Sequence, residues 1–195
     1  RARWEWNHQL TFIDNPWHEY DHERHLDVVG AFGPKYATTR DLLTKKQAQE
    51  AGVDYYSFDH IMKWAEQVAG LAENVIVISK YDCLDDIPPE YVIGYSVPSS
   101  YGGTPIPIER FRGRRIHLLG GSWATQLKYL SLMKEDIVSV DFNLINKTAE
   151  FGGFVHRDGT SAQIGDFIPY QLHNGKMACV ALSLGAIATA LREIF

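Results

Sequence analysis

Short apolar runs rich in β-branched residues recur along the chain and alternate with segments of helical periodicity. Six such runs predict strands, at residues 10–13, 26–32, 75–78, 91–97, 116–119 and 137–140. The runs are continuous rather than alternating, which is typical of strands that are covered on both faces. We therefore expect a mostly parallel sheet.

Four segments between and after these runs predict helices, at residues 44–52, 59–72, 125–133 and 177–195. In the second segment, Ile61, Trp64, Ala65 and Val68 follow the i, i+3, i+4, i+7 spacing of an amphipathic helix. The last segment is apolar on most sides, so we expect it to pack on the core. Strands that alternate with helices indicate βα units.

Two parallel architectures compete, the open doubly wound sheet and the (β/α) barrel. The glycine fingerprints of nucleotide-binding open sheets, G-x-G-x-x-G and G-x-x-x-x-G-K-[ST], do not occur in the expected places. Polar residues instead follow the predicted strands, where a barrel carries its chemistry: Asp14, Lys80, Gly120 and Asp141. A full barrel takes about 250 residues. We predict an α/β fold, a trimmed or incomplete TIM-type (β/α) barrel, formed by 195 residues.

Composition indicates one globular domain over residues 1–195, because 45% hydrophobic and 22% charged residues exclude a disordered chain. No uninterrupted apolar run reaches 18 residues and no signal-peptide pattern opens the chain, so we expect a cytoplasmic protein without a membrane partner. Cys83 and Cys179 are too few for a disulfide framework or a multi-cysteine zinc site. The formal charge of −5 predicts no general affinity for nucleic acid.

Two carboxylates, Asp14 and Asp141, are candidate catalytic residues because each follows a predicted buried strand. A partly buried carboxylate can act as a nucleophile or a general base. For either residue alone, a helix N-cap or an Asx-turn is the commoner role of an aspartate at such a position. As a pair they suit glycosidic chemistry, in which one stabilises or attacks the oxocarbenium-like centre and the other handles protons or reads the base.

Two loops carry the small residues, hydroxyls and aromatic rings that a pocket for a planar base needs. In the first, we expect Tyr95, Ser96 and Tyr101 to line the pocket. In the second, the backbone amides of Gly120, Gly121 and Ser122 can hold an anion or a ribose hydroxyl at a helix start. A turn-rich surface loop and a plain βα turn remain the alternative interpretations.

The chain has one basic cluster, four arginines within six residues: Arg110, Arg112, Arg114 and Arg115. Arginine favours bidentate contacts with phosphate, and Phe111 between them is placed to stack on a base. A solvated basic loop is the alternative. We expect the arginines to bind phosphates beside the pocket.

Three histidines, His18, His22 and His25, lie close together near acidic residues, which raises the question of a metal site. Their spacing lacks the H-E-x-x-H pattern and no cysteine supports them. We interpret them as solvated loop residues and predict neither a metal nor a cofactor.

Three segments together resemble the tRNA-guanine transglycosylase superfamily, and especially its DNA-acting DpdA-like branch. They read YVIGYSVP at residues 91–98, RIHLLGGS at 115–122 and DIVSVDFN at 136–143, and they are similar to the last three barrel strands of the family. By this resemblance Asp141 is the nucleophile that attacks ribose C1′, Asn143 belongs to the base pocket and Lys147 lies in a basic phosphate-binding segment. Residues 11–15 resemble, more weakly, the strand whose aspartate, here Asp14, contacts the base. The cysteines of the family zinc site are missing.

These observations lead to the interpretation of the chain as an enzyme that cleaves the N-glycosidic bond of a flipped-out, modified base in DNA. Glycosylase action that leaves an abasic site, with a role in phage defence, is the first hypothesis. A transglycosylase that inserts a 7-deazaguanine-type base into DNA or tRNA is the second, and a non-catalytic nucleotide-binding module is the third. A barrel enzyme that acts on a small soluble nucleoside or phosphosugar is a weaker fourth.

Overall fold

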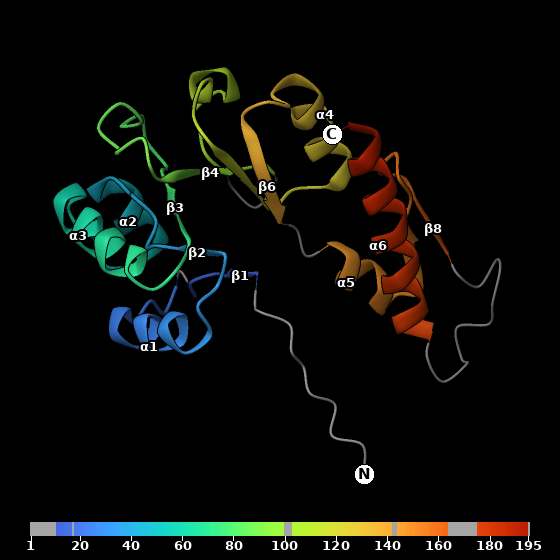
Figure 1. The fold of residues 1–195 in the computed structure, drawn as a ribbon, viewed down its shortest axis with the longest axis horizontal. Coiled ribbons are helices and arrows are strands. Elements are labelled where there is room, and N and C mark those ends of the chain that lie inside the picture. The colour runs from blue at the N-terminus through green and yellow to red at the C-terminus, as the bar shows by residue number, and fades with distance from the viewer. Residues whose placement is uncertain (1–10, 17, 100–102, 142–143, 164–174, 195) are drawn as a thin grey trace, which may run out of the picture. The chain divides into compact units, whose positions relative to one another are not determined.

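The computed structural model describes residues 11–16, 18–99, 103–141, 144–163 and 175–194 (Figure 1). The strands are β1 (Phe12–Ile13), β2 (Tyr36–Thr38), β3 (Asn74–Ile78), β4 (Val92–Ser96), β5 (Ile116–Leu119), β6 (Ile137–Asp141), β7 (Gly153–Val155) and β8 (Ser161–Gln163). The helices are α1 (His22–Phe32), α2 (Lys45–Ala51), α3 (Phe58–Ala69), α4 (Trp123–Leu132), α5 (Leu144–Glu150) and α6 (Gly175–Ile194). A 3₁₀ helix spans Ile108–Phe111.

The main sheet has six strands, which follow one another in the order β1-β2-β3-β4-β5-β6. The pairs β1-β2, β2-β3, β3-β4 and β5-β6 are all parallel. A doubly wound sheet reverses its strand order at a switch point, whereas a barrel keeps the order of the chain. The protein is therefore a mixed α/β fold whose parallel sheet is compatible with a partial β/α barrel.

The chain forms two compact units, which we describe separately. Unit 1 comprises residues 1–94 and 104–107, and unit 2 comprises residues 95–103 and 108–195. Unit 1 contains α1, α2, α3 and the strands β1 to β3, and unit 2 contains β5, β6, α4, α5, α6 and the antiparallel hairpin β7-β8.

In unit 1, residues 26–32 form the second half of α1, so the strand expected there is wrong. The side chain of Asp21 accepts a hydrogen bond from Arg24 N and caps the helix start. Gly33 ends the helix in the left-handed conformation, with φ 52°, and its N–H bonds Val29 O. These two caps outweigh the strand preference of the β-branched residues between them. The strand of this region is instead the short β2, which the sequence pattern did not predict.

The four predicted helices are confirmed within a few residues as α2, α3, α4 and α6. Thr44 begins α2 with a capping box to Gln47, and Ser57 caps α3. The apolar spacing found in the sequence buries Ile61, Ala65 and Val68 of α3. Periodicity and capping residues thus agree along these segments.

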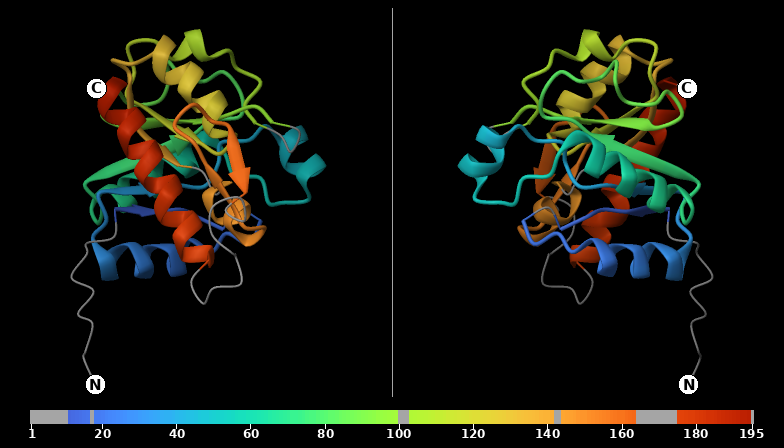
Figure 2. Two further views of the ribbon diagram at one scale, coloured as in Figure 1. Left: turned by 90° about the vertical axis from the view of Figure 1, so that its right-hand side faces the viewer. Right: turned by 90° about the vertical axis from the view of Figure 1, so that its left-hand side faces the viewer.

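In unit 2, the long helix α6 packs against α5 and the β7-β8 hairpin, as both views of Figure 2 show. Cys179 of α6 is buried with Ala149 and Phe154, and Ser183 Oγ accepts a hydrogen bond from Val155 N at 2.9 Å. By length and composition alone α6 is also apolar enough to cross a membrane, and only 22% of that stretch is buried in the protein. Its apolar stretch is shorter than 18 residues because Lys176, Arg192 and Glu193 lie near its ends.

We expect the folded state to lose stability in acid because of His117 in β5. This side chain is buried, and its Nδ1 lies 2.7 Å from Ser139 Oγ in a hydrogen bond. Burial lowers the pKa of His117 to about 4, below the ordinary histidine value of about 6.5. The folded state thus disfavours protonation, so its stability is complete above about pH 6.5 and decreases by about 3 kcal/mol as the pH falls to about 4. We expect His117→Gln to flatten this part of a plot of unfolding free energy against pH. Urea unfolding at a series of pH values measures this free energy. If the unfolding free energy of His117→Gln depended on pH between about 4 and 6.5 as that of wild type does, His117 would not be the cause.

Candidate functional site

Unit 1 gathers polar side chains at the carboxyl ends of β1 and β2. Thr38 Oγ1 donates a hydrogen bond to Asp14 Oδ1 at 3.0 Å, and the backbone N–H of Asn15 donates to the same oxygen at 2.9 Å. The side-chain Nδ2 of Asn15 bonds Thr38 Oγ1 at 2.9 Å and the carbonyl of Thr39. Both donors to Asp14 end on Oδ1, so its carboxyl group is held in one orientation.

Burial of the Asp14 carboxyl group raises its pKa, whereas the hydrogen bonds from Thr38 and Asn15 and the neighbouring His25 oppose the rise. Asp14 as a whole residue is still exposed, so a ligand can reach it. His25 donates from Nε2 to Thr38 O at 2.8 Å, and burial lowers its pKa. Burial therefore disfavours the charged form of both groups, while each favours the charged form of the other.

Arg40 and Asp41 extend this cluster beyond the end of β2. Arg40 is 2% exposed, and its guanidinium carbon lies 5.7 Å from the centre of the Tyr20 ring. Among the described residues, Arg40 Nε and Nη1 have no hydrogen-bond acceptor. Asp41 pairs with Lys80 at 3.6 Å, and burial, followed by the charge of Asp14, raises its pKa against the opposing charges of Lys80 and Arg40. A buried guanidinium with two unpaired nitrogens is costly, which is typical of a functional site rather than of a packed core.

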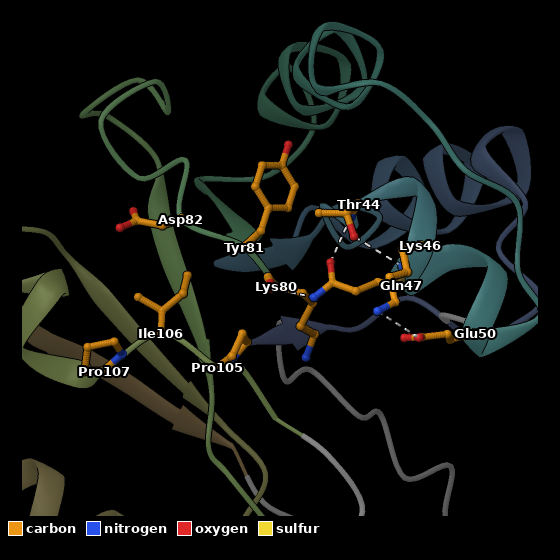
Figure 3. Close-up of a pocket in the computed structure, with 10 residues that line it drawn as sticks. All are labelled: Thr44, Lys46, Gln47, Glu50, Lys80, Tyr81, Asp82, Pro105, Ile106 and Pro107. Atoms are coloured by element: carbon orange, nitrogen blue, oxygen red, sulfur yellow. Dashed lines mark hydrogen bonds and ion pairs between the residues drawn. The ribbon is translucent and has the colours of Figure 1, made fainter.

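A cavity of about 510 Å³ opens beside Lys80 in unit 1 (Figure 3). Gln47 is one of its lining residues and is held by two hydrogen bonds: its Nε2 donates to Lys80 O at 2.7 Å and its backbone N–H donates to Thr44 Oγ1 at 3.2 Å. The lining combines charged, aromatic and proline side chains from α2, from the loop after β3 and from residues 105–107, namely Thr44, Lys46, Gln47, Glu50, Lys80, Tyr81, Asp82, Pro105, Ile106 and Pro107. The cavity therefore adjoins the Asp41–Lys80 ion pair.

Unit 2 brings Asp141 and the glycine turn together at the carboxyl ends of β5 and β6. The N–H of Gly120 donates to Asp141 O at 2.8 Å. The side chain of Gln126, on α4, donates from Nε2 to Gly120 O at 2.7 Å and to Asp141 O at 2.8 Å. Gln126 is fully buried, so it fixes the two strand ends relative to each other.

The turn itself depends on left-handed backbone at Gly120 and Gly121, with φ values of 65° and 73°. A Cβ on Gly121 would lie 2.5 Å from Val97 Cγ1, so this position also excludes a side chain by contact. Ser122 caps α4, because its Oγ accepts from Thr125 N at 3.1 Å. The turn thus presents backbone close to Asp141 at the start of a ten-residue helix.

The remaining predicted pocket residues lie in different surroundings. Tyr95 is 2% exposed, and its ring packs edge-on against Phe111 and Tyr129 in the core of unit 2. Ser96 ends β4 and is half-buried. Tyr101 and Asn143 lie outside the described residues. Asp14 belongs to unit 1 and Asp141 to unit 2, so each carboxylate is described in its own unit.

The arginines lie at the end of β5 opposite the glycine turn, not beside the pocket as expected. Arg115 directly precedes the first residue of β5, whereas Gly120 directly follows its last residue. An extended segment of this length separates them by about 16 Å. Phe111 is fully buried, so the expectation that it stacks on a base is wrong. Lys147 is exposed on α5.

His22 and His25 are buried in α1, so the interpretation as solvated loop residues is wrong for both. His22 stacks on Trp64 with ring centres 4.4 Å apart and bonds Gln67 Oε1 through Nε2 at 2.7 Å. Within the described part of the chain, no group of three or more His, Cys, Asp or Glu side chains is placed to hold a metal ion.

Several residues of these clusters escaped the sequence analysis, chiefly Thr38, Arg40, Asp41 and Gln126. The first three follow or end a strand of three residues, which is too short to give a periodic signal. Gln126 lies on a helix, and nothing in the neighbouring sequence indicates which backbone groups its side chain contacts. Polar residues in the run Thr38-Thr39-Arg40-Asp41 were the only available signal.

Comparison with known proteins places nearly the whole chain in one family. The model of DUF6610, a family of unknown function, matches residues 2–191. No curated protein matches the sequence. The chemistry of the site must therefore be argued from the residues themselves.

Proposed function

Because the chain belongs to the DUF6610 family, whose function is unknown, we propose its activity from its own residues: it cleaves the N-glycosidic bond of a modified base in DNA. The fold in this proposal is a TIM-type, transglycosylase-like barrel. The enzyme acts in the cytoplasm, takes nucleic acid as its partner and serves in defence against phage. The resemblance of residues 91–98, 115–122 and 136–143 to the transglycosylase superfamily supports the proposal.

The observation that carries the proposal is the double hydrogen bond of Gln126 to Gly120 and Asp141. It joins a carboxylate-bearing strand end to a left-handed turn in which Gly120 has open space where a Cβ would lie, so no side chain obstructs a sugar at this residue. Active sites of barrel enzymes occupy this edge of the sheet. A nucleophile beside an unobstructed backbone is the arrangement that attack at C1′ requires.

In the proposed reaction, a carboxylate oxygen of Asp141 forms a bond to C1′ while the C1′–N bond breaks. The bonding electron pair leaves with the base, which takes up a proton. Water then attacks C1′, displaces the aspartate and leaves an abasic sugar, with release of a proton. In unit 1, burial raises the pKa of the Asp14 carboxyl group, which the resemblance makes the residue that contacts the base.

The test is a base-release assay on DNA duplexes that carry modified and unmodified bases. We expect abasic sites to accumulate without any added base. Incorporation of a labelled 7-deazaguanine base in place of abasic sites would instead assign base exchange. Binding without either product on every duplex would contradict an enzymatic function.

A further inference from the structure

The strongest unexplained surface is the arginine surface, which consists of Arg110, Arg112, Arg114 and Arg115 in unit 2. Arg110, Arg112 and Arg115 are exposed and Arg114 is half-buried. Residues 109–115 contain these four arginines and one carboxylate, Glu109, so the segment is basic within a chain whose total charge is −5. Positive charge concentrated on one segment of an acidic protein indicates an anionic partner.

The segment that carries the arginines is held rigidly. Ile108 and Phe111, at 4% and 0% exposure, anchor the 3₁₀ helix in the core of unit 2. Gly113 then turns with φ 77°, and its N–H donates to Asp136 Oδ1 at 3.1 Å, at the start of β6. Arg114 N bonds Phe111 O at 3.1 Å and closes the turn. A rigid base lowers the entropy cost of presenting several arginines together.

The position of the surface favours a role away from the reacting nucleotide. Arg115 and Gly120 flank the four residues of β5, and Asp141 adjoins Gly120 at the far end. This separation is about 16 Å. Duplex DNA advances 3.4 Å per base pair along its axis, so the separation corresponds to about five base pairs.

We propose that the arginine surface binds backbone phosphates of the DNA duplex about five base pairs from the nucleotide at Asp141. Arginine is the side chain whose planar guanidinium matches phosphate geometry with two parallel hydrogen bonds. The surface thus supplies affinity that depends on the length of the duplex and leaves the chemical step unchanged. This inference rests on the proposed function for the position of the target nucleotide, but not for the binding itself.

The test compares Arg112→Ala/Arg115→Ala with wild type in fluorescence-anisotropy titrations of two duplexes that share one target base. One duplex extends about 3 base pairs beyond the target on each side, and the other extends about 12, which passes the expected contact. We expect the double variant to bind the long duplex at least about tenfold more weakly and the short duplex equally well. The slope of log affinity against log salt for the long duplex should fall by about 2.

The matched control is Arg24→Ala/Arg192→Ala, which removes the same charge from exposed positions on α1 and α6. It should bind both duplexes as wild type does, and the thermal midpoints of both variants should match that of wild type. Equal weakening on short and long duplexes would place the arginines at the target nucleotide and overturn the inference. Unchanged binding of the long duplex, with lost binding of poly-glutamate, would overturn it in favour of an acidic protein partner.

The two proposals fail separately. Base release by wild type together with unaltered binding by Arg112→Ala/Arg115→Ala would contradict the arginine surface alone. Length-dependent loss of binding in a protein that releases no base would contradict the proposed reaction alone.

Discussion

Asp141→Asn is expected to lower the rate of base release by at least about 10³-fold at saturating DNA, because the amide cannot supply the attacking carboxylate oxygen. The substitution is nearly isosteric. It also leaves the backbone carbonyl that bonds Gly120 and Gln126 unchanged. DNA affinity should therefore remain close to that of wild type while turnover disappears. Single-turnover measurement of abasic sites, alongside anisotropy titration of the same duplex, separates the two quantities.

The matched control is Asp158→Asn, an exposed aspartate of unit 2 whose Oδ1 accepts hydrogen bonds from Thr160 N and Oγ1. Asparagine keeps that acceptor and makes the same change in charge, so we expect wild-type turnover. If Asp141→Asn retained activity within about threefold of this control, Asp141 would not be the nucleophile, since general acid–base or nucleophilic groups contribute about 10²-fold or more.

Phe111→Ala is expected to reduce the free energy of unfolding by about 3–5 kcal/mol, the usual result of truncating a fully buried aromatic side chain. Phe111 is 0% exposed, and its ring meets Tyr95 edge-on at 5.1 Å. Removal of the ring leaves a cavity and also loses this aromatic contact. Because Phe111 anchors the segment of the arginine surface, the variant should bind long duplexes more weakly as well. Urea unfolding followed by circular dichroism measures the stability change.

Phe151→Ala provides the control, because Phe151 belongs to the same unit and is 80% exposed. Its truncation should change the unfolding free energy by no more than about 0.5 kcal/mol. A loss of similar size in both variants would mean that Phe111 does not belong to the packed core.

Regular elements with a clear period could be predicted from the sequence. The helices α2, α3, α4 and α6 were found because apolar spacing and capping residues point to the same structure over many residues. The error at residues 26–32 arose where these signals disagree, since the β-branched Val28 and Val29 favour a strand while Asp21 and Gly33 cap a helix. The strand β2 was missed because three residues carry no period.

The candidate site could be predicted only in its strand-end residues. Asp14, Asp141 and the turn at Gly120 were found because polar residues directly follow apolar runs. Arg40 and Gln126 were not, because their significance lies in contacts with segments distant in the sequence: the Tyr20 ring for Arg40 and the ends of β5 and β6 for Gln126.

Residue type and spacing suffice to define a parallel α/β chain, most of its helices and the carboxylates that end its strands, because these depend on interactions within one turn or one strand. Only the folded chain decides which of those residues share a site. Arg115 and Gly120 are near neighbours in sequence, yet they lie at opposite ends of the extended strand β5. Gly120 and Asp141, distant in sequence, are joined by a direct hydrogen bond. Proximity in sequence fails as a guide here because a strand separates its two ends, whereas parallel pairing brings the ends of different strands together.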